Sequence, residues 1–168
     1  MKFTFLIICL LVIAPDMYSQ VEYVATESVD EAEFLVGKVD RKSLQEGDFG
    51  QHFLEEYKNY NANLNIVNDI GYEFYGYEII VVMATWCHDS QEQVPRFFKI
   101  MDILNFNTNH IKIICVDKEK SGGDTDISNL NIELVPTFIF YRNDNEKGRI
   151  IETPVNTIEN DILDILNK

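Results

Sequence analysis

One stretch constrains the fold more than any other: residues 79–95, IIVVMATWCHDSQEQVP, in which an apolar run stops abruptly and an amphipathic segment begins. The apolar run predicts a buried strand, and the segment after it predicts a helix. Cys87 falls at the junction, at the expected start of the helix. There the first N–H groups lack intrahelical partners and the helix dipole is positive, which favours a thiolate over a thiol. Cys87 is therefore a candidate nucleophile.

Three motifs, in this order, resemble the thioredoxin family. They are Trp86-Cys87-His88-Asp89-Ser90 after the apolar run, Pro95 eight residues beyond the cysteine, and Val135-Pro136-Thr137 before a second apolar run. The family's usual motif, Trp-Cys-x-x-Cys, has a second cysteine where this chain has a serine. Within the family, the chain resembles an exported, Bacteroidetes-type subgroup with a monothiol Cys-x-Asp-Ser active site. The resemblance covers about residues 77–168.

The resemblance implies an α/β, thioredoxin-like fold, with a mixed central sheet flanked by helices and an N-terminal helical extension. It implies that Cys87 attacks a disulfide sulfur and forms a mixed disulfide. It also implies that the proline of the second motif is cis, so that Val135 and Pro136 bind an extended substrate beside the sulfur. Trp86 and His88 would border the same substrate groove, although His88 is more readily explained as an exposed linker residue.

Ser90 stands where the family has its resolving cysteine. Its hydroxyl can serve the catalytic site by donating a hydrogen bond to the Cys87 thiolate, but it cannot release a mixed disulfide. Release therefore requires another thiol. Dithiol thioredoxins also bury an aspartate six residues before the nucleophile, where this chain has Val81. The missing resolving cysteine and the missing aspartate are consistent with each other, because the aspartate would serve as the proton acceptor for the resolving thiol.

Composition narrows the classes of partner. A chain of 168 residues with 46% hydrophobic content is long enough for one compact domain. Its net charge of −14 predicts repulsion from nucleic acids and anionic lipids. The histidines are scattered and no metal-ligand spacing is present, so we expect neither a metal nor a cofactor. We expect a monomer whose partners are protein or small-molecule thiols and disulfides.

Residues 1–19 are predicted to be a secretory signal peptide. Lys2 precedes the apolar run Phe3–Ala14, and a polar stretch ending in Ser19 follows it. The run is too short to span a bilayer comfortably. We therefore expect export to the periplasm or the extracellular space, with no stable membrane association after cleavage. An uncleaved anchor or a buried N-terminal strand stays open as the alternative.

Signal cleavage would remove Cys9 and leave two cysteines. Cys115 lies in the β-branched run Ile111–Asp117, which predicts a central strand with the cysteine as a small buried hydrophobe. Cys87 should lie beyond the end of a neighbouring strand. We therefore do not expect a disulfide between the two.

Residues 20–71 are predicted to be an N-terminal extension, consisting of a leader and helices that pack on a thioredoxin-like domain at 72–168. The leader is acidic and without clear periodicity, with at most a short helix near 31–35. Asp48 and Gln51 resemble a capping box. Periodicity predicts helices at 49–60, 64–70, 90–105 and 157–166, and strands at 77–85, 111–117, 137–142 and 148–153.

Two functions fit these features. The first is an exported thiol–disulfide oxidoreductase that acts through Cys87 on protein disulfides. The second is a non-catalytic module that holds a peptide in the groove between Cys87 and Pro136. The retained Trp86, Cys87 and Pro136 favour the enzyme, whereas the missing resolving cysteine and buried acid favour the module. We favour the enzyme.

Overall fold

The computed structural model of the protein describes residues 34–168. In chain order its elements are β1 (Gly37–Val39), α1 (Gly47–Asn59), α2 (Leu64–Ile70), β2 (Tyr77–Met83), α3 (His88–Ile103), β3 (Ile111–Cys115), β4 (Thr137–Arg142), β5 (Asn145–Ile151) and α4 (Ile158–Leu166). Short 3-10 helices lie at Ser43–Gln45, Gly71–Phe74, Thr108–His110 and Ser128–Leu130. The predicted signal peptide, Cys9 and most of the predicted leader lie outside the described residues.

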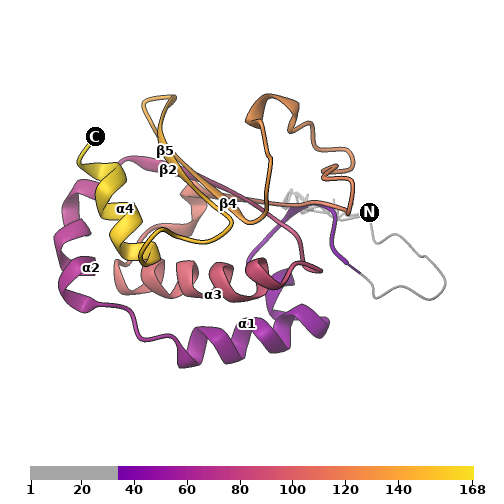
Figure 1. Ribbon diagram of the computed structural model, residues 1–168, viewed down its shortest axis with the longest axis horizontal. Helices are drawn as coiled ribbons and strands as arrows, with labels where there is room; N and C mark the ends of the chain where they lie inside the picture. Colours follow the sequence, from indigo (N-terminus) through magenta and orange to yellow (C-terminus); the bar gives the residue numbers. More distant parts are fainter. Residues whose placement is uncertain (1–33) are drawn as a thin grey trace, which may run out of the picture.

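A five-stranded mixed sheet, with the order β1-β3-β2-β4-β5, runs through the molecule (Figure 1). β2 pairs parallel with β3 and antiparallel with β4. The β4–β5 hairpin forms one side of the sheet, and β1 forms the other. Helices flank this sheet, so the predicted α/β, thioredoxin-like fold class is confirmed. Because β2 and β3 are parallel, their last residues, Met83 and Cys115, pair at the same end of the sheet.

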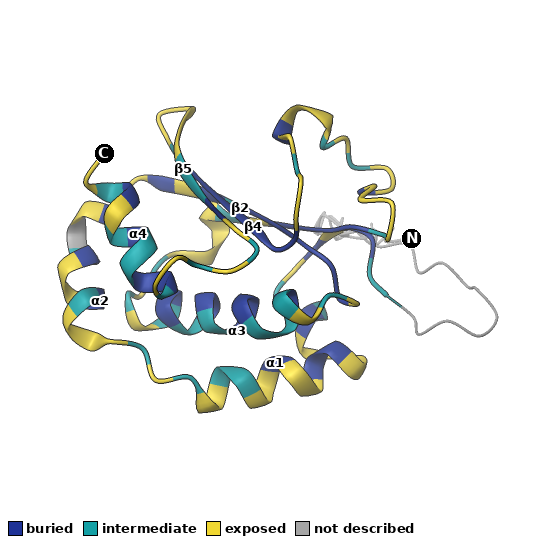
Figure 2. Cartoon of the chain, in the orientation of Figure 1, coloured by how far each residue is buried: buried dark blue, intermediate teal, exposed yellow. Residues whose placement is uncertain are grey.

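The main core lies between the sheet and the helices, where buried residues of α3 face the strands (Figure 2). Phe97 of α3 packs on Phe138 of β4 with ring centroids 4.9 Å apart. Phe98, the next residue of α3, packs on Phe53 of α1 at 5.9 Å. Buried aromatic side chains remove about 150–250 Å² each from water, so these contacts dominate the packing. They fix α3, whose first turn carries the candidate site.

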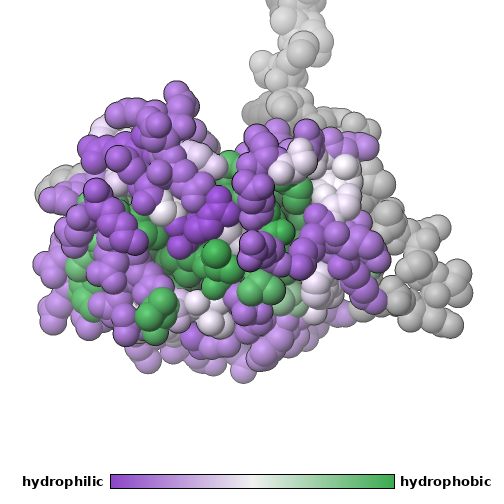
Figure 3. Space-filling view, turned by 45° about the horizontal axis from the view of Figure 1, so that its top comes forward, coloured by the Kyte–Doolittle hydropathy of each residue, from purple (hydrophilic) through white to green (hydrophobic). Residues whose placement is uncertain are grey.

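The opposite face of the sheet has a smaller core. Val82, Ile114 and Ile139 pack there against Leu130 and Val135 from the connection between β3 and β4. In this connection, residues 116–136, the only helix is the 3-10 turn Ser128–Leu130. The connection covers the sheet near the ends of β2 and β3. Figure 3, in which this side is turned toward the viewer, shows exposed apolar side chains with polar side chains on either side of them.

The start of the described chain differs from the sequence-based expectation. Residues 37–39 form β1, antiparallel to β3, where we expected an irregular leader. Leu35, at the end of the expected short helix, is not helical. The capping box is also wrong: α1 begins at Gly47 with Glu46 at the N-cap, so Asp48 lies inside the first turn. A strand of three residues is too short to show an alternation of apolar and polar side chains in the sequence. It forms because it pairs with β3, far along the chain.

The remaining predicted helices and strands are confirmed, with ends that differ by a few residues. The β4–β5 hairpin turns through Asn143 and Asp144, whose φ angles are 51° and 59°. A two-residue hairpin turn of this kind needs positive φ at both positions, which asparagine and aspartate tolerate. β5 therefore begins at Asn145, earlier than predicted.

Two carboxylates, one partly buried and one buried, connect helices α3 and α4 to other segments of the chain. Asp102 of α3 accepts hydrogen bonds from both terminal nitrogens of Arg41, at 2.7 and 2.6 Å, which anchors the segment after β1. Glu159 of α4, 1% exposed, accepts from the Tyr60 hydroxyl at 2.7 Å and from the Asn63 N–H at 2.8 Å. Burial raises the pKa of Glu159, but the hydrogen bonds from Asn63 and Tyr60 together hold it below its ordinary value.

Candidate active site

The turn between β2 and α3 carries Cys87. The backbone N–H of Cys87 donates to the carbonyl of Ala84 at 3.1 Å, which closes a turn directly after β2. The carbonyl of Cys87 accepts the N–H of Gln91 at 3.0 Å, so α3 begins at this point. Cys87 is the N-cap residue of the 16-residue helix, and its side chain is half-buried. The predicted strand–cysteine–helix junction is therefore present in the fold.

The Cys87 thiol does not bond to the first N–H groups of α3, where we expected it. Its Sγ–H donates instead to the backbone carbonyl oxygen of Val135, 3.2 Å away. The Val135–Pro136 peptide bond is cis, as the resemblance implied. Both residues are buried, and they immediately precede β4. The fold thus brings a thiol and a backbone carbonyl together from segments 48 residues apart.

Ser90 is buried, and its hydroxyl contacts the end of the strand before the helix. Its Oγ accepts the backbone N–H of Ala84 at 3.2 Å. Ala84 follows the last residue of β2, so this bond fastens the first turn of α3 to the strand end. Ser90 therefore helps to hold the turn that carries Cys87, and the hydrogen bond from its hydroxyl to the thiolate stays a prediction.

Trp86 and His88 flank the cysteine in different ways. The Trp86 indole N–H donates to the carbonyl of Val116 at 3.1 Å, just beyond the end of β3. The Trp86 side chain is 38% exposed, so it presents apolar surface beside the thiol. His88 is the first residue of α3 and is exposed. Trp86 and Cys87 are thus partly exposed above the buried Val135, while His88 is exposed at the start of the helix.

Sequence reasoning missed Thr85 and Leu35. The Oγ1 of Thr85 accepts the backbone N–H of Leu35 at 3.1 Å, across 50 residues of sequence. The Thr85 carbonyl accepts from the Gln91 side-chain amide at 3.1 Å. The segment that leads into β1 is therefore tied to the turn that presents Cys87. Nothing in the local sequence signals this contact, because it depends on the pairing of β1 with β3.

The loop after β5 also reaches the site. Glu152 donates its N–H to the carbonyl of Pro136 at 2.7 Å. Its φ of 61° is in the left-handed region, which non-glycine residues seldom adopt. The residue that follows β5 therefore lies beside the cis proline, a second neighbour that local sequence patterns did not predict.

Cys115 lies on the other side of the sheet. It belongs to the main core beneath the helices, whereas Cys87 packs against the smaller core on the opposite face. Burial raises the pKa of the Cys115 thiol to about 12. Val81, at the position of the family's buried aspartate, is fully buried in the same main core. Neither residue can serve the Cys87 thiol.

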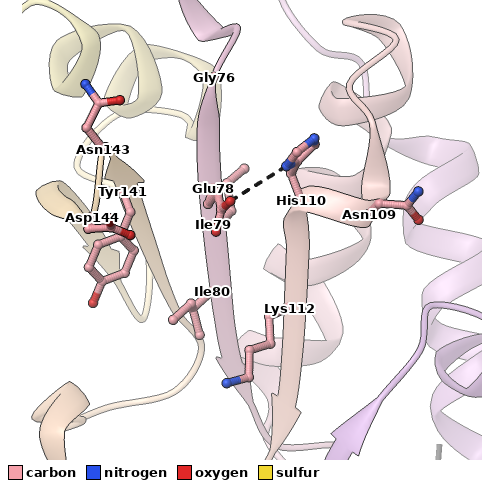
Figure 4. Close-up of a pocket in the computed structure, with 10 residues that line it drawn as sticks. All are labelled: Gly76, Glu78, Ile79, Ile80, Asn109, His110, Lys112, Tyr141, Asn143 and Asp144. Carbon is pink, nitrogen blue, oxygen red and sulfur yellow. Dashed lines mark ion pairs between the residues drawn. The ribbon is translucent and has the colours of Figure 1, made fainter. Parts of the chain in front are cut away.

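A separate hollow lies at the opposite end of the sheet, where β2 and β3 begin. It has a volume of about 590 Å³, and both Glu78 and His110 line it. Their side chains point toward each other (Figure 4), with His110 Nδ1 3.9 Å from Glu78 Oε1. Lys112 and Tyr141 line the same hollow.

Within residues 34–168, no group of three or more His, Cys, Asp or Glu side chains is placed to hold a metal ion. In the same part of the chain, no helix is long and apolar enough to cross a membrane.

No protein-family model matches the chain, and no curated protein matches it significantly. Among solved structures it is similar to a protein of unknown function from Pseudomonas aeruginosa, at 14% identity and a TM-score of 0.47, over 70% of this chain and 81% of that one. It is also similar to thioredoxin O1 from Arabidopsis thaliana (22% identity, TM-score 0.39, 58% and 83%) and to mitochondrial thioredoxin 3 from Saccharomyces cerevisiae (19%, 0.39, 65% and 98%). At these identities the likeness concerns the fold alone.

Proposed function

We propose that the protein is an exported thiol–disulfide oxidoreductase that acts on protein disulfides through the single nucleophile Cys87. One observation carries this proposal. A half-buried thiol at the N-cap of a 16-residue helix lies 3.2 Å from the carbonyl of Val135, the residue before a cis proline. The proposal is supported because a thiol, a helix N-terminus and a backbone acceptor meet at one point.

The first step is attack by the Cys87 thiolate on one sulfur of a substrate disulfide. A bond forms between Cys87 and that sulfur, the substrate S–S bond breaks, and the second substrate sulfur leaves as a thiolate. The proton of Cys87 passes to solvent before the attack, which also frees the Val135 carbonyl. That carbonyl is then available to accept an N–H from an extended substrate peptide.

The second step needs a thiol from outside the chain. The Ser90 hydroxyl is not a thiol, and it is bonded to the Ala84 N–H. Cys115 is fully buried on the opposite face of the sheet, and its raised pKa leaves little thiolate at neutral pH. An external thiol attacks the Cys87 sulfur of the mixed disulfide, and the substrate leaves as a thiol. A second external thiol then attacks the new disulfide on Cys87, which restores the Cys87 thiol and releases the two external thiols as one disulfide. Glutathione-like small thiols and protein thiols have the required chemistry.

The location is part of the proposal. The sequence supports export through the apolar run Phe3–Ala14 and the polar stretch after it, as in the exported monothiol subgroup that the chain resembles. In an oxidising compartment, substrate disulfides would be available to Cys87.

A non-catalytic peptide-binding module is the second candidate. It is favoured by the hydrogen bond from the Cys87 thiol to Val135, since the sulfur in this contact is a thiol and only a thiolate attacks a disulfide. A peptide would then occupy the same groove beside Pro136 without forming a covalent bond.

Insulin-disulfide reduction distinguishes the two candidates. Wild type should reduce insulin when glutathione is supplied, Cys87→Ser should not exceed the uncatalysed rate, and Cys115→Ser should behave as wild type. Equal rates for wild type and Cys87→Ser would favour the binding module. Activity without an external thiol that is lost in Cys115→Ser would contradict the proposed second step.

A further inference from the structure

A second cavity lies far from Cys87, at the end of the molecule where α2 ends and β2 begins. Its volume is about 380 Å³, within the usual range for small-molecule sites. Five of its lining residues carry aromatic rings: Phe74, Tyr75, Tyr77, Phe106 and His110. α3 runs from Cys87 to this cavity, and its 16 residues span about 24 Å. The cavity is therefore separate from the candidate active site.

The rings lie close enough to form a continuous lining. The centroids of Phe74 and Phe106 are 4.9 Å apart, those of Phe74 and Tyr77 5.5 Å, and those of Phe106 and His110 6.3 Å. The Tyr75 side chain is 86% exposed and lies at the mouth. The face of an aromatic ring carries negative electrostatic potential and attracts cations within about 6 Å. The Tyr77 ring already has one cation, since the Arg142 guanidinium carbon lies 5.4 Å from its centroid.

The backbone around the cavity adds negative electrostatic potential to that of the rings. Leu104 and Asn105, directly after α3, and Gly71, directly after α2, all line the cavity. The C-terminal end of a helix carries a partial negative charge, which basic residues of the last turn usually offset. Neither helix has a basic residue in its last turn. The chain as a whole has a net charge of −14, so it has no general repulsion for a cation.

We propose that this cavity binds a small organic cation with an ammonium or quaternary ammonium group. The apolar part of such a ligand packs on the rings, and its charge faces the helix ends. A neutral ligand of the same shape loses the electrostatic attraction, and an anion is repelled. This site is independent of the thiol chemistry proposed for Cys87.

Choline is a suitable probe, and dimethylbutanol, its neutral carbon isostere, is the matched control. Titration of the full chain, followed by NMR of the aromatic ring protons, should shift the signals of Tyr75 and Phe106 with a dissociation constant on the order of 1–10 mM. The isostere should bind more weakly. The Cys87→Ser variant should bind choline as wild type does, so failure of the proposed oxidoreductase activity leaves this test intact.

Variants of Tyr75 separate cation attraction from apolar contact, and the high exposure of this side chain makes a folding defect unexpected. Tyr75→Phe keeps the ring and should bind choline within about twofold of wild type. Tyr75→Leu keeps an apolar side chain without the ring and should weaken binding about threefold to tenfold. Equal affinity for choline and its isostere, unchanged affinity in Tyr75→Leu, or shifts confined to residues away from the cavity would each overturn the proposal.

Discussion

The Sγ–H of Cys87 donates a hydrogen bond to the backbone carbonyl oxygen of Val135, 3.2 Å away. This contact joins the start of α3 to the residue before the cis proline, and it defines where a substrate sulfur would have to arrive. It also means that the thiol in its resting form is bonded to the same carbonyl that an extended peptide would use. In the proposed function, loss of the thiol proton would give the attacking thiolate and free the Val135 carbonyl for the peptide.

Ser90→Cys should increase insulin reduction with a dithiol reductant, because a second thiol would then lie in the first turn of α3. The gain should be partial for two reasons. A thiol is a weaker acceptor for the Ala84 N–H than the hydroxyl it replaces, and Val81 offers no proton acceptor. The measurement is the initial rate of insulin precipitation, with Cys87→Ser/Ser90→Cys as the control. A rate in Ser90→Cys no higher than in wild type would show that residue 90 cannot reach the mixed disulfide.

Cys87 and Cys115 should differ strongly in reactivity. With its pKa raised to about 12 by burial, Cys115 is almost entirely protonated at pH 7, and it is also inaccessible. Iodoacetamide at pH 7 should therefore label Cys87 at least about a hundredfold faster, because only the thiolate reacts. Alkylation of the folded protein followed by peptide mass spectrometry measures both rates in one sample. Equal labelling of the two cysteines would remove the physical basis for Cys87 as the nucleophile.

Thr85→Val should slow the attack of Cys87 on a peptide disulfide about threefold to tenfold, since the lost hydrogen bond to Leu35 is worth about 0.5–1.5 kcal/mol. Thr85→Ser keeps the acceptor oxygen and should react at nearly the wild-type rate. Labelling of Cys115 in the same samples reports opening of the core. If Cys115 labelling rises in step with the loss at Cys87, Thr85 supports stability alone rather than the position of the thiol.

Glu159 should make the free energy of unfolding depend on pH in mildly acidic solution. Its pKa in the folded protein lies below the ordinary value of 4.5, so the folded state binds its proton less readily than the unfolded chain does. The stabilisation is therefore fully present above pH 4.5 and is lost as the pH falls through the lowered pKa. Glu159→Gln should remove this part of the pH dependence and cost about 1–3 kcal/mol at pH 7.

Urea unfolding of wild type and Glu159→Gln between pH 3 and pH 7 measures this effect. Asp164→Asn is the matched control, because Asp164 lies on the same helix and is exposed. The control should follow the wild-type curve. A steep loss of stability below pH 4.5 that persists unchanged in Glu159→Gln would assign the effect to other carboxylates.

The sequence by itself determined the elements on which the site is built. The abrupt end of the apolar run placed Cys87 between β2 and α3, and the β-branched run around Cys115 placed that cysteine in a buried strand. The β4–β5 hairpin followed in the same way from two predicted strands, 137–142 and 148–153, on either side of the turn residues Asn143, Asp144 and Asn145. These features depend on side chains within a few residues of one another, so the spacing of apolar and polar residues in the sequence is sufficient to predict them.

Only the tertiary structure decided what the side chains of the site contact. Cys87 bonds to Val135 across 48 residues, and Thr85 bonds to Leu35 across 50. The Ser90 hydroxyl meets the Ala84 N–H because α3 is fixed against the sheet by its buried aromatic residues. Contacts of this kind follow from the order and register of the strands, which packing of the whole chain sets and no local pattern encodes.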